Sequence, residues 1–165
     1  MRFRPLVLVV GLLILPACSL FGSDPGSFEV AVTGDATASF SGEPVVIINP
    51  ASGDGPERSY AFRLAGPGNE RVVTVTAVSD GTAQLAEGEY PIGRFGLDLG
   101  PGRAVATAFL DDGDFLSVSG SLTLSEVTGD RVRGSFEFEG VGEAGQTATA
   151  QGTFEADLDN NAITS

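Results

Sequence analysis

Residues 117–158 read SVSGSLTLSEVTGDRVRGSFEFEGVGEAGQTATAQGTFEADL, and this stretch decides the fold. Apolar and polar residues alternate along it in three successive runs, with turn-forming residues between the runs. A period of two residues places alternate side chains on opposite faces of a β-strand. The stretch therefore predicts three consecutive antiparallel strands that form a sheet with one apolar and one polar face.

The alternation assigns each residue of the three runs to one face of this sheet. The apolar face is expected to carry Val118, Gly120, Leu122, Leu124, Val132, Gly134, Phe136, Phe138, Ala148, Ala150, Gly152, Phe154, Ala156 and Leu158. The polar face is expected to carry the residues between them, including Ser117, Arg131, Arg133, Glu137, Glu139, Glu155 and Asp157. Glu126 falls on the apolar face opposite Val132, at a strand end where we expect it to reach water; a buried acid is the alternative interpretation.

Loop lengths set the register, because a shift of one residue turns a strand inside out. The tripeptide Thr-Gly-Asp occurs at 33–35 and at 128–130, and a three-residue loop at each place brings apolar faces together. The expected partners are Val32 with Ala36, Val30 with Ala38, Phe28 with Phe40, Leu124 with Gly134 and Leu122 with Phe136. After Leu110 two registers stay open: a four-residue loop pairs it with Phe115, and a five-residue loop pairs it with Leu116.

A short repeat begins with glycine at positions 26, 120, 134 and 152, each followed by Ser or Thr and then an apolar residue. Glycine inside a strand marks a bend, a bulge or a close approach of another group. If Gly134 lies opposite Gly152, the sheet has a thin spot that a large side chain from elsewhere fills. We favour this packing role over a ligand slot.

The rest of the chain continues the pattern of short strands and turns. A hairpin is expected over 28–41, further strands over 45–48, 60–64, 71–78 and 103–110, and an edge segment with Pro91 over 85–93. No segment after residue 17 sustains a helical period. The sequence therefore predicts an all-β antiparallel domain of about eight to ten strands, as a β-sandwich or a partly closed barrel.

Residues 1–18 have a different character from the rest of the chain. A basic head with Arg2 and Arg4 precedes an apolar run over 6–15 that is too short to span a bilayer, and Ala17-Cys18 follows. This segment resembles the signal peptide of bacterial lipoproteins, although Pro16 departs from the usual pattern. The resemblance implies that Cys18 receives a diacylglycerol group and becomes the mature N-terminus. A plain secretory peptide and an uncleaved anchor are the alternatives.

This resemblance divides the chain into a signal peptide (1–17), a lipidated tether (18–26), a single β-domain (27–160) and a C-terminal tail (161–165). It also implies export and anchoring to the cell envelope through acyl chains on Cys18. Ser19 stands where many inner-membrane lipoproteins carry aspartate, so the outer membrane is favoured over the inner one. In general character the mature domain is similar to small all-β envelope lipoproteins of unknown function.

The composition of the chain argues against several classes of function. The chain has no His, and its nine basic residues are all Arg, so His-based triads, most zinc sites and Schiff-base chemistry are not expected. No phosphate-binding loop or dinucleotide motif is present, and we expect no cofactor. The net charge of −13 argues against binding nucleic acid.

Carboxylates are the reactive groups that remain. Glu137, Glu139, Glu155 and Asp157 would support a small glycosidase-like hydrolase if the polar face curved into a groove, but a solvated face is the favoured interpretation. Two acidic clusters are weak candidates for calcium, namely Asp111, Asp112 and Asp114, and residues 157–161. Turn chemistry explains both clusters as well, and we expect no metal site.

The sequence therefore favours a lipid-anchored, non-catalytic domain of the cell envelope with a binding or structural role. An envelope protein or a glycan is the expected kind of partner, beyond the membrane itself. The carboxylate-dependent hydrolase is the alternative function.

Overall fold

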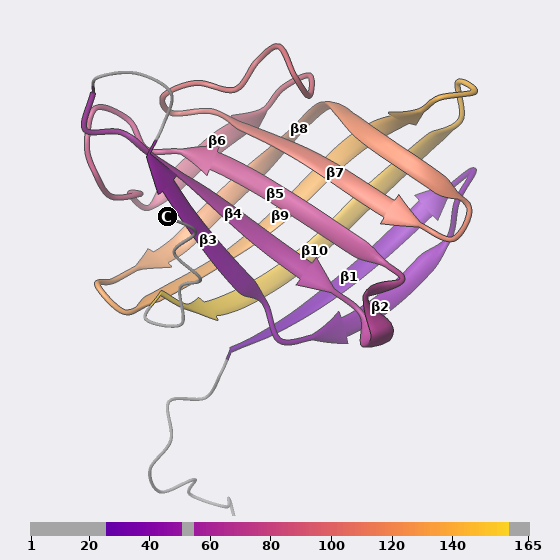
Figure 1. Cartoon of the computed structure of the whole chain (residues 1–165), viewed down its shortest axis with the longest axis horizontal. Helices are drawn as coiled ribbons and strands as arrows, with labels where there is room; N and C mark the ends of the chain where they lie inside the picture. The colour runs from indigo at the N-terminus through magenta and orange to yellow at the C-terminus, as the bar shows by residue number, and fades with distance from the viewer. Residues whose placement is uncertain (1–25, 51–54, 159–165) are drawn as a thin grey trace, which may run out of the picture.

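The computed structural model describes residues 26–50 and 55–158 and places ten strands in them (Figure 1). In chain order the strands are β1 (Ser27–Gly34), β2 (Ala38–Gly42), β3 (Val45–Pro50), β4 (Arg58–Ala65), β5 (Val72–Val78), β6 (Gly88–Ile92), β7 (Ala104–Leu110), β8 (Gly113–Val127), β9 (Arg131–Gly142) and β10 (Thr147–Asp157). A short 3-10 helix, η1 (Pro67–Asn69), stands between β4 and β5. Within these described residues no helix is long and apolar enough to cross a membrane. The predicted all-β fold is confirmed.

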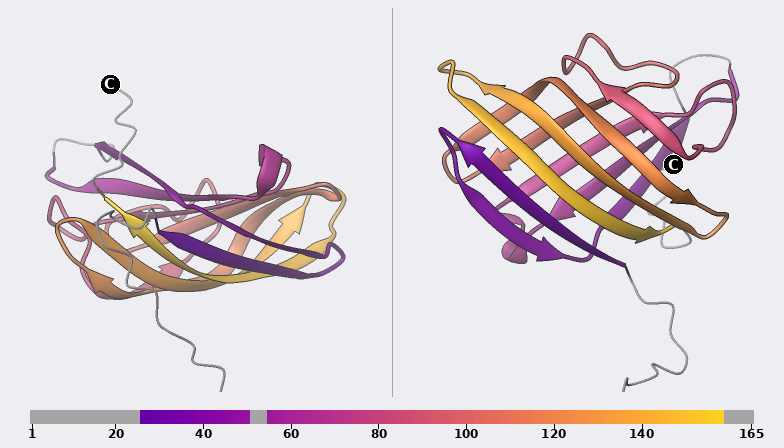
Figure 2. Two further views of the ribbon diagram at one scale, coloured as in Figure 1. Left: turned by 90° about the horizontal axis from the view of Figure 1, so that it is seen from below. Right: turned by 180° about the vertical axis from the view of Figure 1, so that it is seen from behind.

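All ten strands belong to one sheet that curls into a half-barrel, so of the two predicted architectures the partly closed barrel is observed (Figure 2). The order across the sheet is β2-β1-β10-β9-β8-β6-β7-β5-β4-β3, and β8 also pairs with β7. Neighbours are antiparallel except β6 and β7, which share one parallel pair, Ile92 with Ala104. The sequence predicts an edge segment around Pro91. In the structure its strand, β6, lies between β8 and β7 and is therefore not an outer strand, although it pairs with β7 through one residue pair only.

The two outer strands of the sheet, β2 and β3, follow each other in the chain. No ladder joins them among the described residues, so the sheet is not closed between these two strands. At the other extreme of the chain, β1 pairs with β10 from Ser27–Glu155 to Gly34–Ala148. The first and last strands of the fold therefore lie side by side, and β1 begins at the end of the barrel where β10 finishes (Figure 1).

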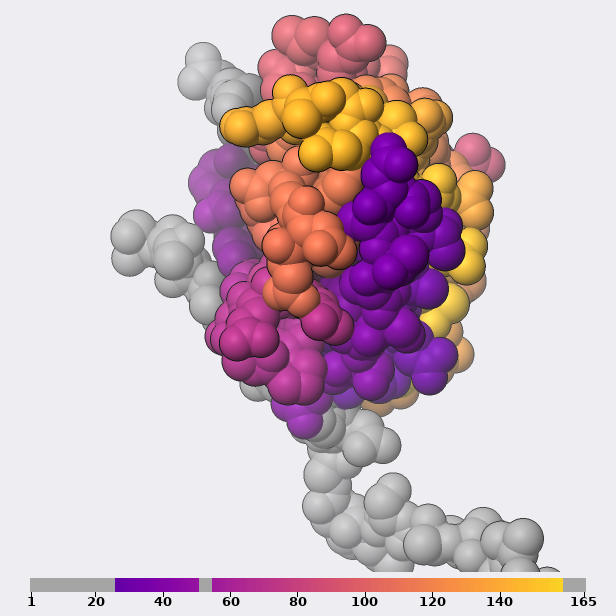
Figure 3. All heavy atoms as spheres, turned by 90° about the vertical axis from the view of Figure 1, so that its right-hand side faces the viewer, coloured from indigo at the N-terminus to yellow at the C-terminus, as the bar shows by residue number. Residues whose placement is uncertain are grey.

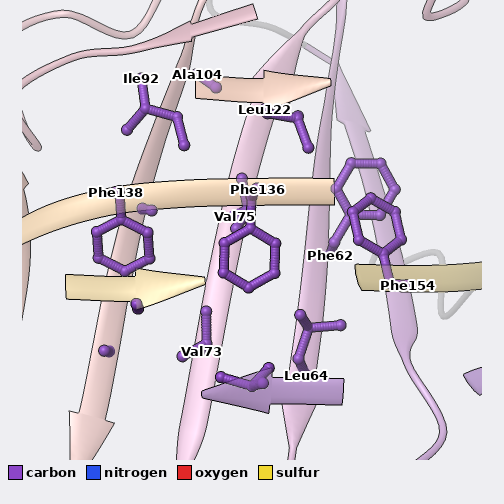
Figure 4. Packing of buried hydrophobic residues seen from close by; sticks show 14 of the residues in the cluster. Phe62, Leu64, Val73, Val75, Ile92, Ala104, Leu122, Phe136, Phe138 and Phe154 are labelled. Carbon is purple, nitrogen blue, oxygen red and sulfur yellow. The ribbon is translucent and has the colours of Figure 1, made fainter. Parts of the chain in front are cut away.

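The interior of the barrel is filled by side chains from opposite walls. Phe62 on β4 lies against Phe154 on β10, with 4.6 Å between the ring centroids (Figure 4). Strands β5 and β7 contribute smaller buried side chains, namely Val73, Val75, Ala77, Ala104, Ala106 and Ala108. The large rings of β9 and β10 thus meet a wall of small residues, and together they form one continuous core.

The β8–β9 hairpin has the predicted register over most of its length. Leu124 pairs with Gly134 and Leu122 with Phe136, as expected. Near the turn, however, Glu126 pairs with Arg133, because the turn has four residues and a bulge at Ser125 restores the register beyond it. The placement of Glu126 on the apolar face is therefore wrong: it lies beside Arg133, and the two charged groups are 3.3 Å apart.

A second bulge lies at Val118, and it reverses the expected faces of the first half of β8. Ser117, predicted on the polar face, is fully buried. Its hydroxyl donates to the carbonyl of Gly93 at 2.7 Å and accepts from the N–H of Ala106 at 3.0 Å. These bonds satisfy a polar group inside the core and tie β8 to the segment after β6.

Two other predicted registers are wrong. In the β1–β2 hairpin, Val32 pairs with Ala38 and Val30 with Phe40, two residues beyond the expected partners, because Thr33 and Gly34 continue the ladder with β10. In the β7–β8 hairpin, Leu110 pairs with Gly113 across a two-residue turn, so neither Phe115 nor Leu116 is its partner. Gly113 has a φ of +137°, which a side chain would disfavour, and this allows the tight turn.

The repeated glycines face phenylalanines rather than one another. Gly134 lies opposite Phe154, and Gly152 lies opposite Phe136, so the conditional pairing of the two glycines is not observed. A Cβ on Gly134 would lie 2.7 Å from the carbonyl oxygen of Thr123 and 3.1 Å from the Phe154 ring. The glycines are therefore close-approach positions that leave room for the neighbouring rings.

This crowding gives a testable expectation for Gly134→Val. The added side chain should overpack the interior and lower the free energy of unfolding by about 1–3 kcal/mol. The matched control is Gly100→Val, since a Cβ at Gly100 meets nothing within 4 Å. Denaturant unfolding monitored by circular dichroism measures both, and an equal or smaller loss in Gly134→Val than in the control would contradict the inward assignment.

Candidate functional site

One end of the barrel contains a pocket of about 410 Å³, which we call the mouth. It lies between β3, β4, the β5–β6 loop, the β8–β9 turn and the end of β10. Its lining residues are Ile48, Tyr60, Ala83, Gln84, Leu85, Val127, Thr128, Gly129, Val132 and Leu158. At the opposite end, the β1–β2, β7–β8 and β9–β10 hairpins and η1 gather over the barrel (Figure 3).

The apolar wall of the mouth is the edge of the core. Tyr60, Leu85 and Val132 are buried, while Ile48, Val127 and Leu158 are half-buried and pack against the core from the rim. These residues come from five separate segments of the chain. The mouth therefore exists only because the curled sheet brings the ends of its strands together.

Tyr60 is the one ionisable side chain in the mouth. Its hydroxyl donates to the carbonyl oxygen of Ala83 at 2.8 Å, which holds the β5–β6 loop against β4. Burial raises the pKa of Tyr60, and the nearby Arg58 offsets part of this effect. The phenol is therefore neutral near pH 7.

The β8–β9 turn forms the far side of the mouth and is held by several hydrogen bonds. The Thr128 hydroxyl donates to Asp130 at 2.7 Å and accepts from the N–H of Arg131 at 3.0 Å. The first of these bonds is the largest cause of the lowered pKa of Asp130. The N–H of Leu158 donates to the Asp130 carbonyl at 2.7 Å, so the turn is also tied to the end of β10.

The mouth differs from the other depressions of the described surface in its charge. Four other depressions each have at least one Asp, Glu or Arg in their lining, whereas the mouth has none. In a chain with a net charge of −13, an uncharged pocket of this size favours an uncharged ligand.

The predicted carboxylates lie on the outer face of β9 and β10 but do not face one another. Glu137 pairs with Gln151, Glu139 with Thr149, and Glu155 with Arg133. Asp157 pairs with Arg131. Glu137 lines an open depression of about 500 Å³ whose other residues include Glu29 and five Ser or Thr residues. The four predicted carboxylates therefore do not meet one another across a cleft, and the second carboxylate in this depression is Glu29 of β1.

Glu155 is instead held by two arginines. Its carboxylate is 2.8 Å from Arg131 and 2.7 Å from Arg133, and Arg133 also contacts Glu126. The hydrogen bond to Glu155 is the largest cause of the raised pKa of Arg133. These exposed pairs order the outer face of the sheet, although such pairs contribute little to stability.

The candidate calcium ligands are separated in the structure. Asp111 is 2.6 Å from Arg71, Asp112 lies in the two-residue turn, and Asp114 is in β8 opposite Phe109. No group of three or more potential metal-binding acids, Cys or His is found in the described part of the chain. Residues 159–161 of the second cluster lie outside the described residues, as do Cys18, the signal peptide, most of the tether and the tail.

Sequence reasoning missed the mouth. The alternation assigns Val132 and Leu158 to the apolar face, as it does any residue of the core, and so does not distinguish a pocket. No protein-family model matches the chain, and no match was found among the curated proteins or the solved structures. The geometry and chemistry of the chain's own residues therefore carry the functional argument.

The acidic turn gives a prediction about ions. Because Asp111 is already neutralised by Arg71, we expect only weak stabilisation by calcium, at millimolar concentrations, and a similar effect of magnesium. Sodium chloride should also stabilise the fold by screening the excess negative charge. Thermal unfolding at matched ionic strength measures these effects. A calcium-specific rise at micromolar concentrations that is lost in Asp112→Asn would contradict general screening.

The buried phenol of Tyr60 gives a prediction about pH. Its pKa is raised on folding, so its contribution to stability is complete below the unfolded pKa of about 10 and is lost as the pH rises through the folded pKa. Tyr60→Phe should cost about 0.5–1.5 kcal/mol near pH 7 by removing the bond to Ala83. It should also flatten the alkaline loss of stability, as measured by urea unfolding between about pH 8 and 11. Tyr90→Phe is the control that should keep this alkaline loss.

Proposed function

We propose that this chain is a lipid-anchored, non-catalytic domain of the cell envelope with a binding role. The observation that carries the proposal is the position of the mouth, which opens at the end of the barrel where β1 begins. The residues before β1 are the proposed tether. The binding pocket and the attachment to the membrane would therefore lie at the same end of the domain.

The contacts of Gly26 support this arrangement. A Cβ on Gly26 would lie 3.1 Å from the Cα of Ala156, so the start of the fold is beside the end of β10. Leu158, a residue of the mouth, follows Ala156 by two positions. A tether of residues 18–26 reaches at most about 30 Å, so the mouth would stay close to the bilayer surface.

The proposed anchor is the set of acyl chains on Cys18. Two or more chains give stable anchoring, because each buried methylene group contributes about 0.8 kcal/mol. Ser19 favours the outer membrane over the inner one. The outer face of β2, β8, β9 and β10, which carries several Ser and Thr residues, would remain accessible to an envelope protein or a glycan.

A carboxylate-dependent hydrolase is the weaker proposal. It would use Glu137 and Glu139 on the outer face, since Glu155 is held by Arg131 and Arg133. Its mechanism needs two carboxyl groups on either side of a bound glycan, and these residues lie on one open strand face.

Metabolic labelling with a fatty-acid probe tests the proposed anchor. The wild-type protein should take up the probe and sediment with membranes, because Cys18 supplies the thiol for the diacylglycerol group. Cys18→Ser should remove the labelling. Labelling that survives this substitution would overturn the proposal, and a Ser19→Ala variant serves as the matched control with unchanged labelling.

A further inference from the structure

We infer that this chain pairs with a second copy of itself through the outer face of β7 and β8 and the loop between β6 and β7. We call this surface the dimer face. Its exposed large apolar residues are Phe95, Leu97, Leu99, Phe109 and Leu116. The inference goes beyond the proposed function and does not depend on the anchor at Cys18.

Exposed apolar side chains are concentrated on the dimer face. Among the described residues six large apolar side chains are exposed, and only Val45, on β3, lies elsewhere. The five segments' positions are linked, because Leu116 pairs with Thr107 of β7 and the N–H of Phe95 donates to the carbonyl of Ser117 at 2.9 Å. A gathered apolar surface of this kind marks an interaction site, whereas single exposed apolar residues do not.

The apolar character continues beneath these exposed side chains. Val72 and Val105 are buried, yet neither belongs to the core cluster inside the barrel. Val72 pairs with Phe109, and Val105 lies on the same outer side of β7 as Phe109, four residues earlier. The dimer face therefore has an apolar floor that is already packed, which reduces the cost of ordering it on binding.

One end of the dimer face carries two free guanidinium groups. Arg94 and Arg103 stand at the two ends of the β6–β7 loop, beside the start of β7, because the N–H of Gly93 donates to the carbonyl of Ala104. Neither arginine side chain has an ion pair or a hydrogen bond within the described part of the chain. Both are therefore available to a partner of opposite charge.

The two ends of the dimer face differ in their acids. At the arginine end, Asp98 accepts the N–H of Arg94 at 2.8 Å and Asp80 lies close to the loop, so this end is neutral in sum. At the other end of β7 stand Asp112 and Asp114, which have no ion pair among the described residues. That end is negative and faces solvent.

This distribution of charge suits a second copy. A twofold axis through the middle of β7, near Thr107, would make the two β7 strands antiparallel. Arg103 precedes β7 and Asp112 follows it, so the axis brings Arg103 of each copy towards Asp112 of the other. The apolar centres then cover each other, and the contact closes on itself without leaving a free half.

A bilayer is a poorer partner for this face. Four strands separate β7 from β1 in either direction around the barrel, so the dimer face lies on the wall opposite the strand that follows the proposed tether. The β6–β7 loop is at the top of Figure 1, whereas β1 begins near the bottom. The net charge of −13 also opposes contact with an anionic lipid surface.

Disulfide trapping in intact cells that produce the full-length chain tests the inference. Leu116→Cys places a thiol close to the proposed axis, and Phe109→Cys provides a second position there. Ser135→Cys, on the exposed outer side of β9, is the matched control. Copper-phenanthroline oxidation and non-reducing electrophoresis measure the covalent dimer, with the wild type, which has only Cys18, as background. Thermal unfolding of the purified proteins restricts the comparison to folded variants.

We expect at least about fivefold more covalent dimer from Leu116→Cys and Phe109→Cys than from Ser135→Cys, because the axis brings the same residue of two copies together. In the Leu116→Cys background, Leu97→Ser should lower the yield, whereas Val45→Ser should leave it unchanged. Equal yields at the trapping and control positions would overturn the inference.

Charge reversal identifies the partner as a second copy. Arg103→Asp and Asp112→Arg should each lower the yield of Leu116→Cys at least about fivefold, because like charges then meet across the axis. The two reversals together should restore the yield, and a double variant that stays low would overturn the inference. These residues stand at opposite ends of β7, so one chain cannot pair them by itself. Loss of fatty-acid labelling at Cys18 would overturn the anchor and leave the dimer unaffected.

Discussion

The structure depends on how a curled sheet fills its own interior. Three phenylalanines of β9 and β10 lie beside a glycine of a neighbouring strand: Phe154 beside Gly134, Phe136 beside Gly152, and Phe138 beside Gly120. Gly134 and Gly152 leave the space in which the adjacent ring lies, whereas Gly120 is held close to the backbone of β9. The rings belong to the same core as the small residues of β5 and β7. Close packing of this kind tolerates little added volume, which explains why the glycines recur at intervals in the sequence.

The mouth lies at the end of the barrel where the β5–β6 loop, the β8–β9 turn and the end of β10 meet. These segments end there without covering the edge of the core completely. The side chains of Ile48, Val127 and Leu158 remain half-buried there, at the rim of the core. The apolar part of the lining is therefore the edge of the core, and Gln84 and Thr128 contribute polar groups. Its lack of charge follows because charged residues are placed on the outer face, as with Arg133 and Glu155.

The sequence predicts the strands well because alternation is a local property. It places Phe136, Phe138 and Phe154 on the inner face and the carboxylates of β9 and β10 on the outer face, as observed. It fails where a single residue changes the alternation, as the bulges at Val118 and Ser125 do for Ser117 and Glu126. The mouth could not be predicted, because its residues come from five segments and only the register of the whole sheet brings them together.

The pairing of β1 with β10 has a consequence for the order of events when the chain folds. The strand nearest the proposed anchor is completed on one side by β2, but its other neighbour is the last strand of the sheet. Ladders between such distant segments form late, because closing a long loop costs conformational entropy before the contacts are gained. The β1 edge of the sheet therefore stays unpaired until β10 has been made available for pairing. When β10 pairs with β1, it also places Leu158 in the lining of the mouth. For a polypeptide that crosses a membrane unfolded, this topology would delay the finished shape until translocation is complete.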